Sequence, residues 1–211
     1  MEAMTIVSLK TGSDNSAGTV KIVFSDNSSL TLRSCYLEHY SHAPSSLEIG
    51  MELSSAEEDA LKFASNCFRA ECTAMRLIAR AEQTSTGLSH KLERRGYQSA
   101  CVSAVIARLV DQDLVNDRRY AERWLRSRLT RKTGRIRGPR HLSAALGNRS
   151  IDRRAIKEAL DNVLDDETEY ELLQRFLAKN RTNSISQAYL RSYLRYEGFS
   201  SPAINLYFEA N

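Results

Sequence analysis

Basic side chains concentrated in the middle of the chain are the residues best able to do chemistry. Residues 118–157 carry fourteen Arg and Lys but only two acidic side chains, whereas residues 1–75 and 158–211 are each net acidic. Guanidinium and ammonium groups bind phosphates and carboxylates, and a positive segment between acidic flanks is typical of a polyanion-binding surface. The formal net charge of +4 conceals this asymmetry. The sequence therefore predicts contact with a polyanion.

A helix expected over residues 117–132 presents part of this charge. At 100° per residue, Ala121, Trp124 and Leu125 share a face that should pack inward. Arg128 falls on that apolar side, so its side chain must extend to solvent, pair with an acid or point at a partner. Together with the loop that follows, the candidate contacts are Arg119, Arg123, Arg126, Arg128, Arg131, Lys132, Arg135, Arg137 and Arg140.

The loop at 131–140 has a composition suited to anions. Gly134 and Gly138 lie among its basic residues, and Pro139 is expected in the first turn of the next helix. The N-terminus of that helix would add free backbone N–H groups, which favour an anion. Contacts from Arg and Lys to backbone phosphates give affinity without reading base sequence. The alternative is a solvated basic face that serves only solubility.

Motifs for enzymatic chemistry are missing from the sequence. Gly134-x3-Gly138 is followed by Pro139 rather than by the Lys-Ser/Thr of a phosphate-binding loop, and neither GxSxG nor HExxH occurs. Acid pairs such as Asp165-Asp166 suit helix ends better than acid–base catalysis. We therefore expect no catalytic residues and no cofactor.

Cysteine and histidine spacing does not predict a metal site. The four Cys form no CxxC pair, so reduced, partly buried thiols are expected, and His39-x2-His42 has few supporting ligands. The sequence has no run of about 18 apolar residues and no basic-then-apolar leader at residue 1. We expect a cytoplasmic protein that does not contact a membrane.

A repeated pattern organises the rest of the chain. Each copy begins with two Leu that are four positions apart. A Gly or Ser stands four positions after the second Leu, and a Tyr, Ile or Phe directly follows it. An apolar residue stands five positions after that Tyr, Ile or Phe. The pattern starts at Leu88, Leu142 and Leu190, with spacings of 54 and 48 residues. The Leu pair marks one helix face, the Gly or Ser a left-handed helix end, and the last apolar residue the next helix. Repetition at this period is typical of stacked helical units.

The elements before the first repeat differ in character. Residues 19–24 and 29–32 alternate around turn formers at 25–28, which predicts a hairpin, and Met4 to Leu9 can add a third strand. Residues 34–53 look irregular. A helix is expected from near Ser54 to about Arg80, with Ser55 and Glu58 as a capping box and a break near Cys67–Thr73 left open.

These elements predict a mainly α protein of tandem three-helix, helix-turn-helix-like repeats in an elongated array, with a small N-terminal β-hairpin or sheet module. Helices at 117–132, with Asp117 as N-cap, and 167–179 open the second and third repeats. The expected divisions are a β module and linker at 1–53 and repeats at 54–115, 116–165 and 166–211. The second repeat is the basic one. We expect a monomer.

Four runs of this sequence resemble the RecX family, the regulatory proteins of the bacterial recombinase RecA. Residues 114–121 (LVNDRRYA) resemble the family's L-D/N-D-x-R-F-A, and residues 138–146 resemble its G-P-x-x-I-x-x-E-L. Residues 88–97 and 193–199 resemble the family's helix ends, at which Gly is followed by Phe. The resemblance covers about 74–208. Gly87 and Ala145 stand where the family has Glu, and Ser150 where it has Gly.

The resemblance implies a non-enzymatic modulator, with inhibition as the expected effect. It implies binding to the RecA–DNA filament and reduced ATP hydrolysis, filament growth and strand exchange, within DNA repair, homologous recombination and the SOS response. It also implies binding of single- and double-stranded DNA through backbone phosphates, with the nine basic residues as RecA or DNA contacts. Two alternatives stay open: a general DNA-binding repeat protein that acts without RecA, and a structural interaction protein whose Arg cluster serves solubility.

Overall fold

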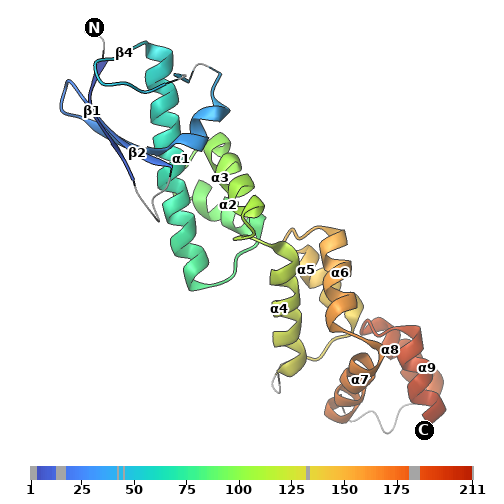
Figure 1. Cartoon of the computed structure of the whole chain (residues 1–211). Helices are drawn as coiled ribbons and strands as arrows, with labels where there is room; N and C mark the ends of the chain where they lie inside the picture. Colours follow the sequence, from blue (N-terminus) through green and yellow to red (C-terminus); the bar gives the residue numbers. More distant parts are fainter. Residues whose placement is uncertain are drawn as a thin grey trace. The chain divides into compact units, whose positions relative to one another are not determined.

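The chain folds into two compact units, residues 1–115 and 116–211, and each is described by itself (Figure 1). The computed structural model describes residues 4–12, 18–41, 43–44, 46–131, 134–180 and 186–210. It confirms a mainly α protein with a small N-terminal antiparallel sheet. The finer divisions at residues 53 and 165 stay predictions.

The sheet of the first unit contains β1 (Met4–Thr11), β2 (Thr19–Phe24), β3 (Ser29–Arg33) and β4 (Glu52–Leu53), in the order β3-β2-β1-β4. All neighbouring strands are antiparallel. The β2–β3 hairpin and the third strand are confirmed. Residues 34–53, expected to be irregular, also supply a 3-10 helix (Ser34–His39) and β4.

The long helix α1 (Ser55–Arg80) packs along this sheet (Figure 1). Its capping box lies one residue earlier than predicted: the Ser54 side chain accepts from the Glu57 N–H at 3.3 Å, and the Glu57 carboxylate accepts from the Ser54 N–H at 2.8 Å. The helix continues through Cys67–Thr73, so the open break does not occur. A stripe of mostly small buried residues holds that segment against its neighbours: Ala60, Leu61, Ala64, Cys67, Ala70 and Ala74.

A buried carboxylate ties the first unit together. Glu71 of α1 is 6% exposed and accepts from the Arg33 Nε at 3.0 Å and the Tyr36 hydroxyl at 2.8 Å, and the Arg108 Nε lies 3.8 Å away. Burial and the nearby Glu71 raise the pKa of the Tyr36 phenol, which therefore stays protonated and donates. One acid thus joins β3, the 3-10 helix, α1 and the helix that contains Arg108, α3 (Ser99–Asp111).

Removing this acid should loosen the first unit. Glu71→Gln removes the carboxylate that faces the guanidiniums of Arg33 and Arg108, and breaking a buried ion pair costs about 3 kcal/mol. Hydrogen exchange of α1 amides should show that loss directly. The control is Glu58→Gln, which removes an exposed contact with Lys62 and should cost less than about 1 kcal/mol. Equal protection in both variants would contradict the stabilising role of Glu71.

Three sets of three helices follow one pattern. The first set is α1 with α2 (Ser85–Glu93) and α3 (Ser99–Asp111). The second is α4 (Asp117–Thr130), α5 (Pro139–Gly147) and α6 (Arg153–Val163). The third is α7 (Asp166–Asn180), α8 (Gln187–Tyr196) and α9 (Ser201–Ala210). In each set the third helix packs on the first two.

The turn in each set has the left-handed residue that the repeat predicted. Gly96, Ser150 and Gly198 have φ of 87°, 58° and 88°. Ser150 adopts this conformation with a Cβ, which costs roughly 1 kcal/mol relative to Gly. At the start of α4 the cap is Asn116, whose side chain accepts from the Arg119 N–H at 2.9 Å, rather than the predicted Asp117.

The second and third sets share one hydrophobic core within the second unit. It contains buried residues from Ala121 in α4 to Ile204 in α9, including Leu146, Leu173 and Leu194. Neither set encloses this core alone, as expected of stacked repeats. The basic segment of the sequence therefore lies on a scaffold to which both repeats contribute.

Candidate nucleic-acid interface

The predicted basic residues separate onto different sides of the second unit. Four of them, Arg128, Arg131, Arg135 and Arg137, line one pocket. Arg126 lies on another flank of α4. Arg119 and Arg123 have contacts of their own, Arg140 is exposed at the start of α5, and Lys132 lies outside the described residues. Helix geometry explains why Arg126 and Arg128 separate, because side chains two positions apart on an α-helix point in nearly opposite directions.

The pocket combines an apolar interior with a basic rim. Its volume is about 310 Å³. The apolar side chains are Trp124, Leu129, Ile136, Leu142, Ala145 and Leu172, and the basic ones are Arg128, Arg131, Arg135, Arg137, His141 and Arg149. No Asp or Glu is among the described residues that line it. The cavity therefore favours an anionic ligand that also has an apolar face.

Two guanidiniums stack on the indole of Trp124. The Arg128 Cζ lies 4.9 Å from the ring centroid and the Arg149 Cζ lies 5.0 Å from it. The sequence placed Arg128 on the apolar side of its helix. In the structure its guanidinium lies over the aromatic ring of Trp124 rather than in the core. Arg149 also donates to the Ala145 carbonyl at 2.6 Å, which fixes its position.

Basic residues of α7 hold the loop backbone beside the pocket. Arg175 donates to the carbonyls of Leu129 at 2.6 Å and Arg131 at 2.9 Å, and Lys179 donates to the carbonyl of Gly134 at 2.5 Å. The Leu129 carbonyl belongs to the last turn of α4 and the other two lie beyond its end, so helical N–H groups are not available to them. Side chains of α7 therefore hold the backbone at Leu129, Arg131 and Gly134, on both sides of the start of the loop.

The end of the loop docks on the turn between α8 and α9. Gly138 N–H donates to the Glu197 carbonyl at 2.9 Å, and Arg140 N–H donates to the Gly198 carbonyl at 3.1 Å. The N–H groups of the next two residues of α5 bond to the Gly138 carbonyl. Pro139 is the first residue of α5, as predicted, but the expectation of free N–H groups there is wrong, because the neighbouring turn and the loop itself occupy them.

Arg135 is engaged at the same place. Its guanidinium donates at 2.7 Å to the carboxylate of Glu197, whose residue is 2% exposed. The ring of His141 forms a 2.7 Å hydrogen bond with the Tyr196 carbonyl. These two lining groups therefore fix the pocket wall, which leaves the other cations to face a ligand.

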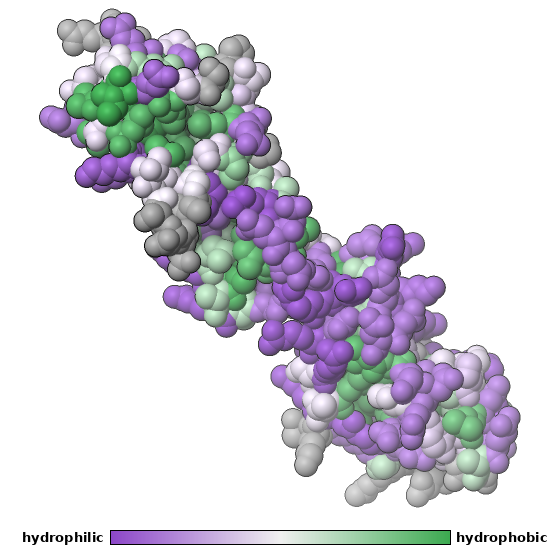
Figure 2. Space-filling model, in the orientation of Figure 1, coloured by the Kyte–Doolittle hydropathy of each residue, from purple (hydrophilic) through white to green (hydrophobic). Residues whose placement is uncertain are grey.

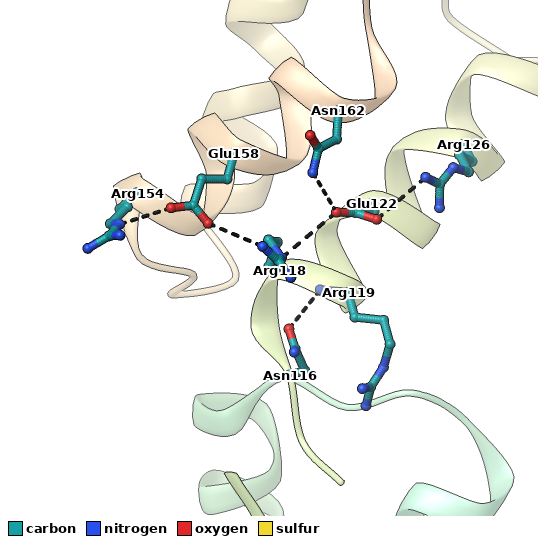
Figure 3. A network of polar contacts seen from close by, with 8 residues as sticks. All are labelled: Asn116, Arg118, Arg119, Glu122, Arg126, Arg154, Glu158 and Asn162. Atoms are coloured by element: carbon teal, nitrogen blue, oxygen red, sulfur yellow. Dashed lines mark hydrogen bonds and ion pairs between the residues drawn. The ribbon is translucent and has the colours of Figure 1, made fainter. Parts of the chain in front are cut away.

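Arg126 belongs to a polar network between α4 and α6 (Figure 3). Glu122 contacts Arg126 at 3.4 Å, Arg118 at 3.9 Å and the Asn162 amide at 3.1 Å. Glu158 contacts Arg118 at 3.7 Å and Arg154 at 2.9 Å. Acid thus offsets part of the charge on this flank, whereas among the described cations that line the pocket only Arg135 is paired with an acid, Glu197.

In the view of Figure 2, the second unit presents mainly hydrophilic residues, interrupted by hydrophobic patches. Sequence reasoning missed Arg149, His141 and Glu197 as participants. Only the basic character of 118–157 pointed to Arg149, and no local pattern pointed to Glu197, which lies 62 residues from its partner Arg135.

Two other features of the described residues bear on function. None of the helices placed in the structure is long and apolar enough to cross a membrane. Within the described ranges, His, Cys, Asp and Glu side chains do not gather in groups of three or more that suit a metal ion. His42 and the side chain of His39 lie outside those ranges.

Three-helix units that share one core and carry a basic pocket define a class of helical-repeat protein. The chain belongs to the RecX family, as its motifs indicated. It is 31% identical over 153 residues to the regulatory protein RecX of Treponema pallidum (strain Nichols), covering 72% of this chain and 91% of that one. It is 32% identical over 130 residues to the RecX of Pseudomonas putida (strain GB-1), covering 60% and 81%. The chain is a regulatory protein of the RecX type.

Solved structures have the same fold. One RecX crystal structure matches with a TM-score of 0.72 at 19% identity, covering 96% of this chain and 97% of the other. The RecX of Lactobacillus salivarius matches with a TM-score of 0.61 at 24% identity, covering 70% and 97%. No family model matches the chain.

Proposed function

We propose that this chain modulates RecA by binding the RecA–DNA filament, and that binding lowers ATP hydrolysis, filament growth and strand exchange. The protein acts as a monomer in the cytoplasm, by contact rather than by catalysis. The basic side of the second repeat supplies the contact. The observation that carries this proposal is the acid-free pocket rim of Arg128, Arg131 and Arg137 on a RecX scaffold.

The charges on this rim are suited to DNA phosphate or to acidic protein surface. The described residues offer no ion-pair partner to Arg131 or Arg137. Their charge is therefore available to a ligand at little cost of breaking internal pairs. Contacts of this kind give affinity that falls steeply with salt.

A second candidate is a DNA-binding repeat protein that acts without RecA. Residues 118–157 carry fourteen basic but only two acidic side chains, and this excess of positive charge favours the second candidate. This candidate predicts that every effect on RecA is explained by occupation of the DNA.

One titration separates the two. Single-strand-DNA-dependent ATP hydrolysis by the cognate RecA is measured while this protein is added from far below one molecule per RecA. Strong inhibition at substoichiometric ratios supports the RecA proposal. Inhibition only when the protein suffices to coat the DNA supports the second candidate, and no effect at any ratio refutes the RecA proposal.

A further inference from the structure

The pocket beside Trp124 has features that phosphate binding alone does not require. A purely electrostatic contact needs only exposed cations, as on the outer side of α4. Here six apolar side chains form the interior, and the cations stand around it. A half-open apolar pocket with a positive rim fits a group that is flat and apolar at one end and anionic at the other.

The stack on Trp124 supplies flat surfaces of the right kind. The indole and the guanidiniums of Arg128 and Arg149 are planar, and they already lie against one another. Nucleobases stack on both aromatic rings and guanidinium planes. Arg149 is held by the Ala145 carbonyl, while Arg128 is exposed and has no ion pair among the described residues. A base can therefore extend or enter this stack on the Arg128 side.

The remaining cations are arranged for the phosphates. Arg135 is paired with Glu197, and His141 is hydrogen-bonded to the Tyr196 carbonyl, so both side chains form part of the pocket wall. Arg131 and Arg137 are exposed on the rim and lack an acidic partner in the described part of the chain. A volume of about 310 Å³ lies at the lower limit for small-molecule sites, which suits one nucleotide rather than several.

We propose that this pocket binds a single unpaired nucleotide of a DNA strand. The base lies in the apolar interior against the Trp124 stack, and the flanking phosphates contact Arg131 and Arg137. An acidic peptide fits less well, because carboxylate side chains have no flat apolar face for the interior. This inference rests on the proposed function, and it adds a preference for single-stranded DNA whose bases are free to leave the strand.

Trp124 allows a direct test, because it is the only Trp in the chain. Its fluorescence is followed while the intact protein is titrated with oligothymidylate, with an abasic strand of equal length, with a duplex and with polyglutamate. Oligothymidylate should change the fluorescence and bind about tenfold more tightly than the abasic strand, since stacking adds to the same phosphate contacts. Equal affinities for the two strands, or a tighter response to polyglutamate, would overturn the proposal.

Two variants of α5 make a matched pair. Ala145 lines the pocket, whereas Ala144 is exposed and does not line it. Ala145→Leu should fill the interior and reduce the affinity for oligothymidylate about tenfold, to that of the abasic strand, with an unchanged salt dependence. Ala144→Leu makes the same change in composition and helix propensity and should bind like the unaltered protein. Equal affinities in both variants contradict the pocket assignment.

The RecA assay separates this failure from that of the proposed function. If RecA is inhibited substoichiometrically but the abasic strand binds as well as oligothymidylate, the nucleotide pocket is refuted and the proposed function stands. If neither DNA binding nor RecA inhibition is seen, both are refuted.

Discussion

Gly138→Ala should lower the free energy of unfolding of the second unit by about 3 kcal/mol. A Cβ at this position would fall onto the backbone of Gly198 and Phe199, and backbone cannot move aside as a flexible side chain does. The strain of such overpacking costs about 1–3 kcal/mol. If the loop moved away from the α8–α9 turn to make room for the Cβ, the backbone hydrogen bonds of Gly138 and Arg140 to that turn would break. Buried Glu197 would also lose its contact with Arg135.

The fluorescence of Trp124 in urea reports this change, because the only Trp lies in the second unit. Gly147→Ala is the matched control, at the other end of the same helix. Nothing lies within 4 Å of a Cβ there, so the variant should be more stable by about 0.5 kcal/mol through helix propensity and chain entropy. A Gly138→Ala variant as stable as the unaltered protein would contradict the tight docking of the loop.

Replacing Arg128, Arg131, Arg137 and Arg140 with Gln should abolish inhibition of RecA while the helix content stays unchanged. All four side chains are exposed, so apart from the contact of Arg128 with the Trp124 ring, their loss removes contacts with a partner rather than packing in the core. Binding to single-stranded DNA should weaken at least tenfold. The slope of log affinity against log salt should become shallower by at least about 1.4, since each phosphate contact on a single strand contributes about 0.7 and Arg131 and Arg137 are the two proposed phosphate contacts.

The lower net charge by itself must be excluded as the cause of the lost inhibition. Arg76, Arg80, Arg94 and Arg95 are exposed in the first unit, and their replacement by Gln changes the net charge equally. That variant should inhibit RecA as the unaltered protein does. Full inhibition by the variant of the second repeat would show that the contact lies elsewhere, and the pocket would then have no part in the RecA interaction.

Local patterns in the sequence were sufficient to predict most of the secondary structure. The hairpin, the Leu pairs and the left-handed residues at Gly96, Ser150 and Gly198 each depend on neighbours within a few positions. The two N-caps were each placed one residue late. Ser54-Ser55 and Asn116-Asp117 offer adjacent capping side chains, and only the backbone geometry selects the first of each pair.

The candidate site was harder to predict because long-range contacts build it. Arg149 meets Trp124 across 25 positions, and Gly138 meets Gly198 across 60. No periodicity within a helix encodes either approach. The basic segment could be recognised from composition, but which arginines share a cavity and which pair with Glu122 depends on how α4, α5 and α7 pack.

The support that α7 gives to the loop limits how freely the repeats can be rearranged. Repeat proteins are often extended or shortened by whole modules, because each module contacts only its neighbours. Here Arg175 and Lys179 of one module donate hydrogen bonds to backbone carbonyls of the module before it. The order of the last two repeats is therefore part of the proposed binding site, and an additional repeat inserted between them would separate the loop from its support.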